Sequence, residues 1–530
     1  MPQQVVTSPG QTIWPLRVMP GIKRDGTVFE GSFWVDGQWV RFQRGVPRSI
    51  GGYQAIATGF SGISRGVSQL ARGGVILFHS GSANKLEQAQ VSFGASAGVV
   101  DRTPAGFVAD PMNVWQFELM WNAAAGSSNM ALIAHAAPNL NCIDYSDQRK
   151  VWYGPVGGST QLVDTGAAPV SGGVICLHPF LFTYDNDGGV AWSDANQPTV
   201  WSGTGTAAGS ARVTEQKIVK GMVVRGGPGY SPSGLFWSLN SLVRASYIGG
   251  TAIFSFDTIS DQTSILSSSA VIEYDGLYYW PGIDRFLVYN GIVREVPNNL
   301  NLNYFYENLN YGQAQKIWAA KVPRFGEIWW FYPRKPATEC NDAIIHNVRE
   351  NTWYDAGLAI GAHRSAGTYP QTVRYPLWMG NDAEKDGTYT LYQTERGVDR
   401  VERNNIANAI HSYIESCDIS WCGQGPNQQW AGIQRNMRIN RLELDFLQTA
   451  PMTLTIRGKA YAQGEVDAGD SFPYGPGTLN TSHIDMSAMT QRRQMRLNFD
   501  SNVQGGAWQM GTPLAHFGMG DERPTPEDPT

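Results

Sequence analysis

The chain has 530 residues and a formal net charge of −5, with 42% hydrophobic and 16% charged residues. A chain of this length exceeds what one small hydrophobic core normally supports, so several domains or one large repetitive domain are expected. The weakly negative charge argues against a protein that holds nucleic acid by neutralising phosphates, which requires a clustered Lys/Arg footprint.

Glycine, proline and aromatic residues are abundant in the composition. The chain contains 60 glycines, 29 prolines and 12% aromatic residues, and long amphipathic helical periods are not visible. Such a composition is typical of many short strands joined by tight turns, so we expect an all-β fold with very little helix. Residues 1–19 have no basic start followed by an apolar core, so a signal peptide is not expected, and no apolar run approaches the length of a membrane span. Five scattered cysteines indicate reduced thiols.

Residues 1–50 begin with a segment rich in Pro, Gly and Thr and continue with alternating aromatic and β-branched residues. The sequence DGQWVRF at 36–42 predicts a hairpin whose turn is Asp36-Gly37, because Asp-Gly tolerates the positive φ that such turns need. We expect this segment to pack with the C-terminal part of the chain.

Residues 51–400 repeat a strand, turn, strand pattern roughly every 40 to 60 residues, the spacing expected for propeller blades of about four strands. We therefore predict a β-propeller of six to eight blades, with two paired sandwiches as the alternative. Residues 300–315 are the one convincing helical window in this region, because Leu302, Phe305, Tyr306 and Leu309 recur near helical spacing. Clear examples of the repeated pattern lie at 75–84, 119–134, 174–192, 234–247, 270–289 and 327–354.

The sequence pattern changes after residue 400, where the expected strands become longer. Longer strands are expected at 414–421, 437–446, 452–457 and 494–499, which indicates a separate sandwich-like β platform domain over 401–515. It is locally basic, whereas residues 516–530 are rich in proline and acidic residues and are predicted to be a disordered tail.

No catalytic motif is recognised, since no His-Glu-x-x-His pair occurs and none of the eight histidines has a recognisable metal-binding or nucleophile spacing. We therefore expect a protein that is not an enzyme, with no catalytic, cofactor-binding or metal-binding residues. The glycine-rich stretch 203–209 is interpreted as a flexible turn, because its third glycine is displaced from the dinucleotide-binding pattern. Cys417 and Cys422 have no second Cys/His pair nearby, so a zinc site is disfavoured.

Three further patterns have a functional and a structural interpretation. Asp185-Asn186-Asp187-Gly188 and residues 384–386 could bind calcium, but neither continues into a closing carboxylate, so hairpin turns are favoured. The aromatic runs 278–280 and 329–332 could form a sugar-stacking platform, but alternate strand residues face opposite sides, so packing between sheets is favoured. Segments 183–190 and 193–201 approach the turns of sialidase-like propellers without matching them.

Three blocks of sequence carry a resemblance to a known family. They lie at the start, centre and end of the chain, and the stretch 60–250 between the first two matches nothing familiar. In order and spacing the blocks resemble nozzle or packaged-DNA stabilisation proteins from the tails of short-tailed bacteriophages. The blocks are 36–42 with Gly45, Pro47 and 50–53; then 304–310, Lys316, 325–333 and 351–357; then 445–446, 492–497 and 506–511.

This resemblance implies a structural virion protein that forms a tail nozzle, a hexameric ring below the portal and its adaptor. Such a ring would close and line the DNA exit channel without sequence-specific contact and would carry tail fibres or a tail needle. The chain would be assembled in the bacterial cytoplasm, without membrane insertion or cofactors, and 401–515 would dock on the adaptor. The alternatives are a phage receptor-binding propeller and a glycan-active propeller.

Overall fold

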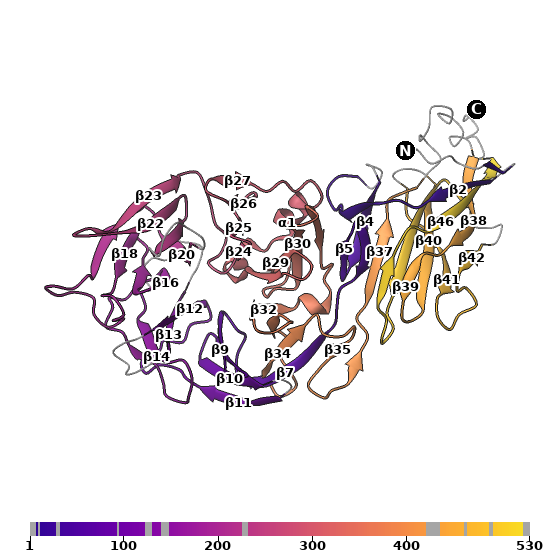
Figure 1. The fold of residues 1–530 in the computed structure, drawn as a ribbon. Coiled ribbons are helices and arrows are strands. Elements are labelled where there is room, and N and C mark those ends of the chain that lie inside the picture. The colour runs from indigo at the N-terminus through magenta and orange to yellow at the C-terminus, as the bar shows by residue number, and fades with distance from the viewer. Residues whose placement is uncertain are drawn as a thin grey trace.

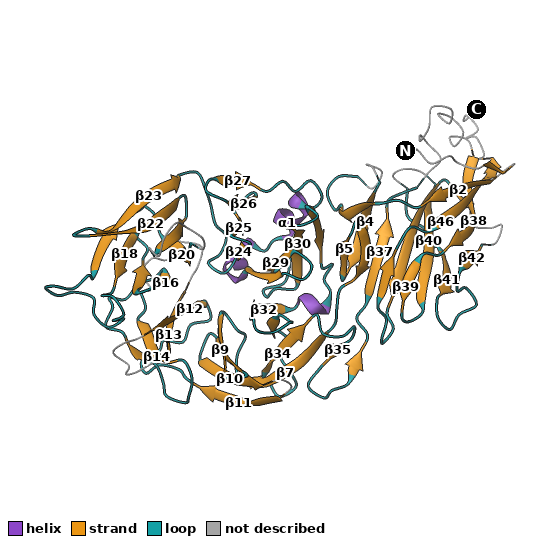
Figure 2. Cartoon of the chain, viewed as in Figure 1, coloured by secondary structure: helices purple, strands orange, loops and turns teal. Residues whose placement is uncertain are grey.

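The computed structural model describes residues 7–8, 11–27, 32–92, 95–121, 130–138, 148–224, 232–419, 435–460, 464–486 and 491–522. The described chain is almost entirely β-structure, arranged as a propeller with a second β-domain at one side (Figures 1 and 2). The predicted all-β propeller fold with a second β-domain and very little helix is confirmed.

Seven four-stranded antiparallel blades form the propeller, within the predicted range of six to eight. Blade 1 contains β8 (Val67–Arg72), β9 (Val75–Gly81), β10 (Leu86–Ser92) and β11 (Ala95–Asp101); blade 2 contains β12 (Asn113–Trp121), β13 (Met130–Pro138), β14 (Val151–Pro155) and β15 (Val163–Asp164); blade 3 contains β16 (Gly173–Leu177), β17 (Phe180–Tyr184), β18 (Gly189–Trp192) and β19 (Gly209–Arg212). Blade 4 contains β20 (Ile218–Val223), β21 (Ser233–Ser238), β22 (Leu242–Gly249) and β23 (Ile253–Ser260); blade 5 contains β24 (Ile272–Tyr274), β25 (Leu277–Pro281), β26 (Phe286–Tyr289) and β27 (Val293–Glu295); blade 6 contains β28 (Trp318–Val322), β29 (Glu327–Tyr332), β30 (Asp342–Asn347) and β31 (Thr352–Asp355).

The seventh blade is built from both ends of the propeller sequence. Three of its strands are β32 (Arg364–Thr368), β33 (Leu377–Gly380) and β34 (Tyr389–Thr394), and the fourth is β7 (Tyr53–Phe60), which pairs antiparallel with β34. Two short strands, β35 (Arg400–Val401) and β36 (Ala407–Asn408), extend the same sheet, with β35 parallel to β7. The innermost strand β32 contacts β8 of blade 1, so the last blade lies beside the first.

The second β-domain combines strands from both ends of the chain in three sheets. One sheet has the order β1 (Thr7–Ser8), β2 (Gln11–Pro15), β46 (Leu514–Glu522), β38 (Arg435–Glu443), β42 (His483–Asp485), with β43 (Gln491–Arg492) also on β38. A second has the order β3 (Met19–Ile22), β4 (Phe33–Gln38), β37 (Ser412–Ser416), β44 (Gln494–Ser501), β40 (Met452–Lys459), β41 (Asp470–Tyr474). The third has the order β39 (Phe446–Gln448), β45 (Trp508–Met510), β6 (Val46–Ser49), β5 (Val40–Gln43).

The predicted hairpin turn at Asp36-Gly37 is wrong, because strand β4 runs straight through both residues. The chain turns instead at Trp39, whose φ is 53°, and again at Arg44 and Gly45 with φ values of 57° and 76°. Gly37 serves close packing: a Cβ there would lie 3.0 Å from the Ile22 side chain and 3.2 Å from the Tyr413 carbonyl oxygen. A glycine is therefore needed at position 37, but the reason is the close approach of neighbouring strands and not a turn.

Two shorter helical segments replace the single helix predicted over 300–315. The α-helix α1 (Leu302–Asn308) ends where Leu309 is extended, and the 3-10 helix η1 (Tyr311–Lys316) follows it. A third segment, η2 (Ile360–Ala362), is also a 3-10 helix. The first turn of α1 is capped from outside, because the Asp25 carboxylate accepts hydrogen bonds from the backbone N–H groups of Asn303 and Tyr304, both at 2.8 Å.

The prediction of disorder from residue 516 is also wrong for the residues that the structure describes. Strand β46 continues to Glu522 and pairs with β2 on one side and β38 on the other. Ala515 and Phe517 are buried, so apolar side chains alternate into the core of this strand. The proline- and acid-rich remainder, 523–530, lies outside the described residues.

We predict that Trp329→Ala destabilises the chain by about 3–5 kcal/mol, because Trp329 is fully buried and its removal leaves a large cavity. Denaturant unfolding would measure this loss. Leu479→Ala is the matched control, since Leu479 is fully exposed and its truncation should change the unfolding free energy by less than about 0.5 kcal/mol. Equal effects for the two variants would contradict the prediction.

Candidate functional site

The most distinctive site in the described chain is the junction between the propeller and the second β-domain. A single hydrophobic core runs across it, from Trp318 and Trp329 in blade 6, through Trp39 and Phe42 of the N-terminal segment, to Phe499 in β44. The Trp39 and Trp329 rings meet edge to face with centroids 5.9 Å apart, and Phe42 and Tyr354 do so at 5.4 Å. Since the core is continuous, the two domains are held as one packed body.

Arg41 lies at the centre of this junction and is 1% exposed. Its Nε and Nη2 donate to the two carboxylate oxygens of Glu327 at 2.8 and 2.9 Å, and its Nη1 and Nη2 donate to Glu395 at 2.8 and 2.5 Å. The guanidinium carbon also lies 3.8 Å from the centroid of the Phe325 ring. One cation from β5 therefore joins blade 6, through Glu327, to the end of blade 7, through Glu395.

The remaining hydrogen-bonding capacity of Glu327 is also used. Trp329 Nε1 donates to its carboxylate at 2.8 Å, and the Tyr354 hydroxyl donates at 2.6 Å. Burial raises the pKa of Glu327, while attraction to Arg41 opposes that rise. Burial alone would lower the pKa of Arg41, but Glu327 and Glu395 outweigh it and raise that pKa above its ordinary value. A buried charge of this kind is tolerated only when its partners and hydrogen bonds are complete.

A second ionic cluster lies beside α1 at the same junction. Arg24 Nε and Nη2 donate to the two carboxylate oxygens of Asp355 at 3.0 and 2.8 Å, and Nη1 also pairs with Asp36. The Tyr304 ring of α1 is contacted by two guanidinium groups, with its centroid 5.2 Å from Arg24 and 4.9 Å from Arg334. The cluster therefore ties the N-terminal segment to blade 6 and to the helix before it.

Asp342 is the least well paired carboxylate of this cluster. It is fully buried; its Oδ1 accepts from the Ala343 backbone N–H at 2.8 Å, but among the described residues its Oδ2 receives only long contacts, from the Tyr332 hydroxyl at 3.3 Å and from Arg334 Nη1 at 3.4 Å. Burial raises the pKa of Asp342 to about 6, and repulsion from Asp355 adds to the rise. This group consequently takes up a proton at mildly acidic pH.

The candidate zinc and calcium ligands do not come together in the part of the chain that the structure describes. Cys417 is buried with a free thiol, while Cys422 lies outside the described residues. Across the described ranges, no group of three or more His, Cys, Asp or Glu side chains could hold a metal ion. Within those ranges, too, every helix is too short or too polar to cross a membrane.

The two candidate calcium turns are held by ordinary hydrogen bonds. The Asp185 Oδ1 accepts from the Ser171 backbone N–H and hydroxyl at 2.9 and 2.7 Å, and Asp386 accepts from Thr388 and Arg403. The glycine-rich stretch 203–209 contains a turn, closed by a 2.8 Å bond from the Thr206 hydroxyl to the Gly203 carbonyl, and leads into β19 at Gly209. Every residue of the aromatic runs 278–280 and 329–332 is buried, so neither run is a stacking platform.

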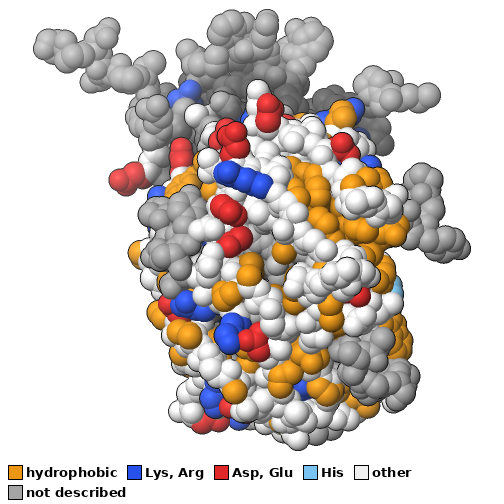
Figure 3. Space-filling view, turned by 90° about the vertical axis from the view of Figure 1, so that its left-hand side faces the viewer, with side chains coloured by type: hydrophobic (Ala, Val, Ile, Leu, Met, Phe, Trp, Pro, Cys, Tyr) orange, Lys and Arg blue, Asp and Glu red, His pale blue; other side chains and the backbone are white. Residues whose placement is uncertain are grey.

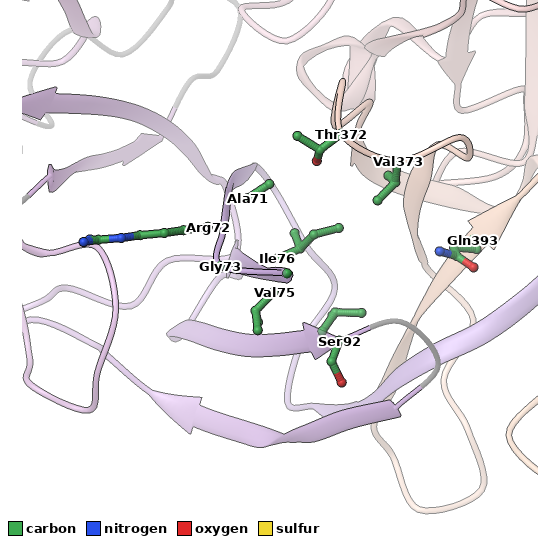
Figure 4. A pocket seen from close by; sticks show the side chains of 11 residues that line it. Ala71, Arg72, Gly73, Val75, Ile76, Ser92, Thr372, Val373 and Gln393 are labelled. Atoms are coloured by element: carbon green, nitrogen blue, oxygen red, sulfur yellow. The ribbon is translucent and has the colours of Figure 1, made fainter.

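A small apolar hollow lies at the seam between blades 1 and 7. It has a volume of about 220 Å³ and is lined by the β8–β9 turn, by part of β10 and by Thr372, Val373 and Gln393. Aliphatic side chains from both blades meet in it, whereas Arg72 extends away (Figure 4). At the end of the propeller farthest from the second domain, acidic and basic side chains are interspersed with hydrophobic ones (Figure 3).

We predict that Arg41→Met destabilises the chain by about 3–5 kcal/mol, because it leaves Glu327 and Glu395 buried without their cation. Arg72→Met is the control, since this exposed arginine lies outside the junction. Adding Glu327→Gln to Arg41→Met should recover part of the loss by removing one stranded charge. Unfolding free energies that are the same for Arg41→Met and wild type would contradict this role.

We predict that Asp342→Asn becomes more favourable relative to wild type as pH rises from 4 to 7. The pKa of Asp342 is raised in the folded state, so the wild type folds with a neutral carboxyl at low pH and bears the cost of burying a charge above pH 6. A gain of about 2 kcal/mol is expected across this range, and urea unfolding at several pH values would measure it. A pH-independent difference between the two proteins would contradict the assignment.

Comparisons with known proteins add little to these observations. No protein-family model matches the sequence, and no curated protein matches it. Among solved structures, the chain is similar to the AfRom2 CNH domain, with 9% identity and a TM-score of 0.27 over 53% of this chain and 94% of that domain. A likeness at this TM-score carries no argument about fold or function.

Proposed function

We propose that this chain is a structural subunit of the tail nozzle of a short-tailed bacteriophage. The observation that carries the proposal is where the three resemblance blocks lie. They are far apart in the sequence, yet parts of all three adjoin one another at the domain junction, whereas 60–250, which carries no resemblance, supplies the blades away from it (Figure 1). This proximity supports the proposal.

Specific contacts join the blocks. Arg41 and Trp39 of the first block contact Glu327 and Trp329 of the second, as described above. The first and third blocks are linked by one hydroxyl: Ser412 Oγ donates to the Trp39 carbonyl at 3.2 Å and accepts from Trp508 Nε1 at 3.1 Å. Three blocks that contact one another support an architecture shared with the tail proteins better than three blocks without mutual contacts would.

The mechanical character of the junction also suits the proposed role. A subunit that lines a DNA exit channel would have to keep its domains aligned as DNA passes. A continuous core and two buried ionic clusters resist relative movement of the domains, because any hinge would expose Arg41 or Arg24 and leave their carboxylates unpaired. We propose that the second domain docks on the adaptor ring and that the propeller flanks the channel and carries fibres or a needle.

The proposed assembly is a homohexameric ring of the virion tail, formed in the host bacterial cytoplasm. Packaged DNA would pass through its lumen without sequence-specific contact, in keeping with the net charge of −5. A ring requires two different contact surfaces on each subunit. The receptor-binding and glycan-active alternatives draw no support from the aromatic runs, which are buried.

We predict that the purified chain forms six-fold rings by itself or on adaptor rings, as seen by negative-stain imaging and light scattering. Hydrogen exchange with adaptor present should then show new protection over the described parts of 435–522 and little over blades 1 to 4. Arg72→Met, which leaves the junction intact, should assemble as the wild type does, and it is the control for the junction variant Arg41→Met. A chain that stays monomeric with adaptor and binds saccharides would contradict the proposal, as would protection confined to blades 1 to 4.

A further inference from the structure

A polar cavity of about 210 Å³ lies on the propeller axis. Its wall includes residues of the innermost strands β8, β12, β20, β28 and β32, together with the loops that precede β8, β24 and β28. Six of the seven blades therefore contribute, and the cavity is a product of the whole ring. It shares Trp318 with the hydrophobic core of the junction and has no lining residue in common with the apolar hollow at the seam.

Three cationic side chains line this cavity, namely Arg65, Lys220 and Lys316. Arg65 donates to both oxygens of Glu339 at 2.8 and 2.6 Å, and Lys316 Nζ donates to the same carboxylate at 2.8 Å. One carboxylate thus serves two cations, which leaves an excess positive charge on this part of the wall.

Lys220 adds to that excess. Within the described chain it makes no hydrogen bond or ion pair, and its nearest counter-charge is Glu118, which acts by longer-range attraction. Burial lowers the pKa of Lys220, and Glu118 opposes the change. Burial also raises the pKa of Glu118 to about 7, so near neutral pH this carboxyl is only partly charged. The Lys220 side chain is therefore a half-buried basic group whose nearest counter-charge only weakly compensates it.

Two buried polar groups in the wall also have unused hydrogen-bonding capacity. Ser365 is 6% exposed and Gln315 is 3% exposed, and neither the Ser365 hydroxyl nor the Gln315 amide oxygen has a partner among the described residues. Gln116 differs, because its amide donates to the Gly172 carbonyl at 2.8 Å and accepts from the Tyr184 hydroxyl. Buried polar groups without partners are rare and call for a ligand or ordered water.

We propose that the axial cavity binds a small phosphate-type oxyanion, either free phosphate or a small phosphate monoester. Oxyanion oxygens would accept from Lys220 and Ser365, and the field of Arg65 and Lys316 would stabilise the negative charge. A protonated phosphate oxygen or an ester hydroxyl would donate to the Gln315 amide oxygen. This inference does not rest on the phage proposal, since it depends on the propeller ring alone.

We predict that the intact chain binds inorganic phosphate in calorimetric titrations at constant ionic strength, and that Lys220→Gln weakens binding about tenfold or more through loss of a charge-assisted hydrogen bond. Lys385→Gln is the matched control, because Lys385 is exposed and lies outside the cavity. Tighter binding of glycerol phosphate than of phosphate would identify a monoester as the ligand, and the reverse order would identify free phosphate.

Glu118→Gln provides an independent check, because it removes the carboxylate that competes for Lys220. This variant should bind phosphate several-fold more tightly, an outcome that a misfolded protein would not give. Sulfate should bind more weakly than phosphate, since it has no proton to donate to Gln315. Equal weak binding of phosphate, sulfate and chloride, unaffected by Lys220→Gln, would mean an adventitious ion only and would overturn the proposal, as would no binding of either phosphate compound.

Discussion

The pairing of Arg41 with two glutamates is the constraint on which the arrangement of this chain depends. The three side chains come from positions 41, 327 and 395, and they meet only when β5, blade 6 and the end of blade 7 are all in place. Each partial arrangement leaves a charge in the core without its partner, at a cost of several kcal/mol. The pairing therefore favours one relative placement of the domains over the many that hydrophobic contact alone would permit. The Trp39, Phe42 and Trp329 rings then fill the space around it.

The first 60 residues contribute to both domains, which affects how the chain can fold. Strands β5 and β6 pair locally, but β4 pairs with β37 and β6 with β45, both more than 370 residues later in the chain, and β7 pairs with β34 more than 300 residues later. Pairings at such long separation are slow to form because the closing loops cost entropy before contacts compensate for it. Blades 1 to 6 contain only strands that are neighbours in sequence, so they can form before the N-terminal segment pairs with its distant partners.

Local patterns in the sequence predicted the fold class well but not the junction. Turn residues and strand alternation over 75–354 identify hairpins that the structure contains, because both partners lie within a few residues of each other. The partners of Arg41 lie 286 and 354 positions away, and no local pattern indicates them. Asp36-Gly37 shows the same limit: the dipeptide is typical of a turn, but packing against Ile22 and Tyr413 holds it in a strand. The acidic residues near the C-terminus likewise predicted disorder and outweighed the apolar alternation of β46. In the structure, pairing with β2 and β38 holds this segment as a strand.

The chain enters and leaves the propeller at the same blade, and the two crossing segments are bonded to each other. The Gly52 N–H donates to the Gly397 carbonyl at 2.9 Å, the Tyr53 N–H to Asp399 at 3.1 Å, and the Arg396 N–H returns to Gly52 at 3.0 Å. A force that pulls the second domain away from the propeller would thus act first on this short clasp and on blade 7. The other six blades would carry no tension through the backbone, so the propeller could keep its shape while the second domain is under load.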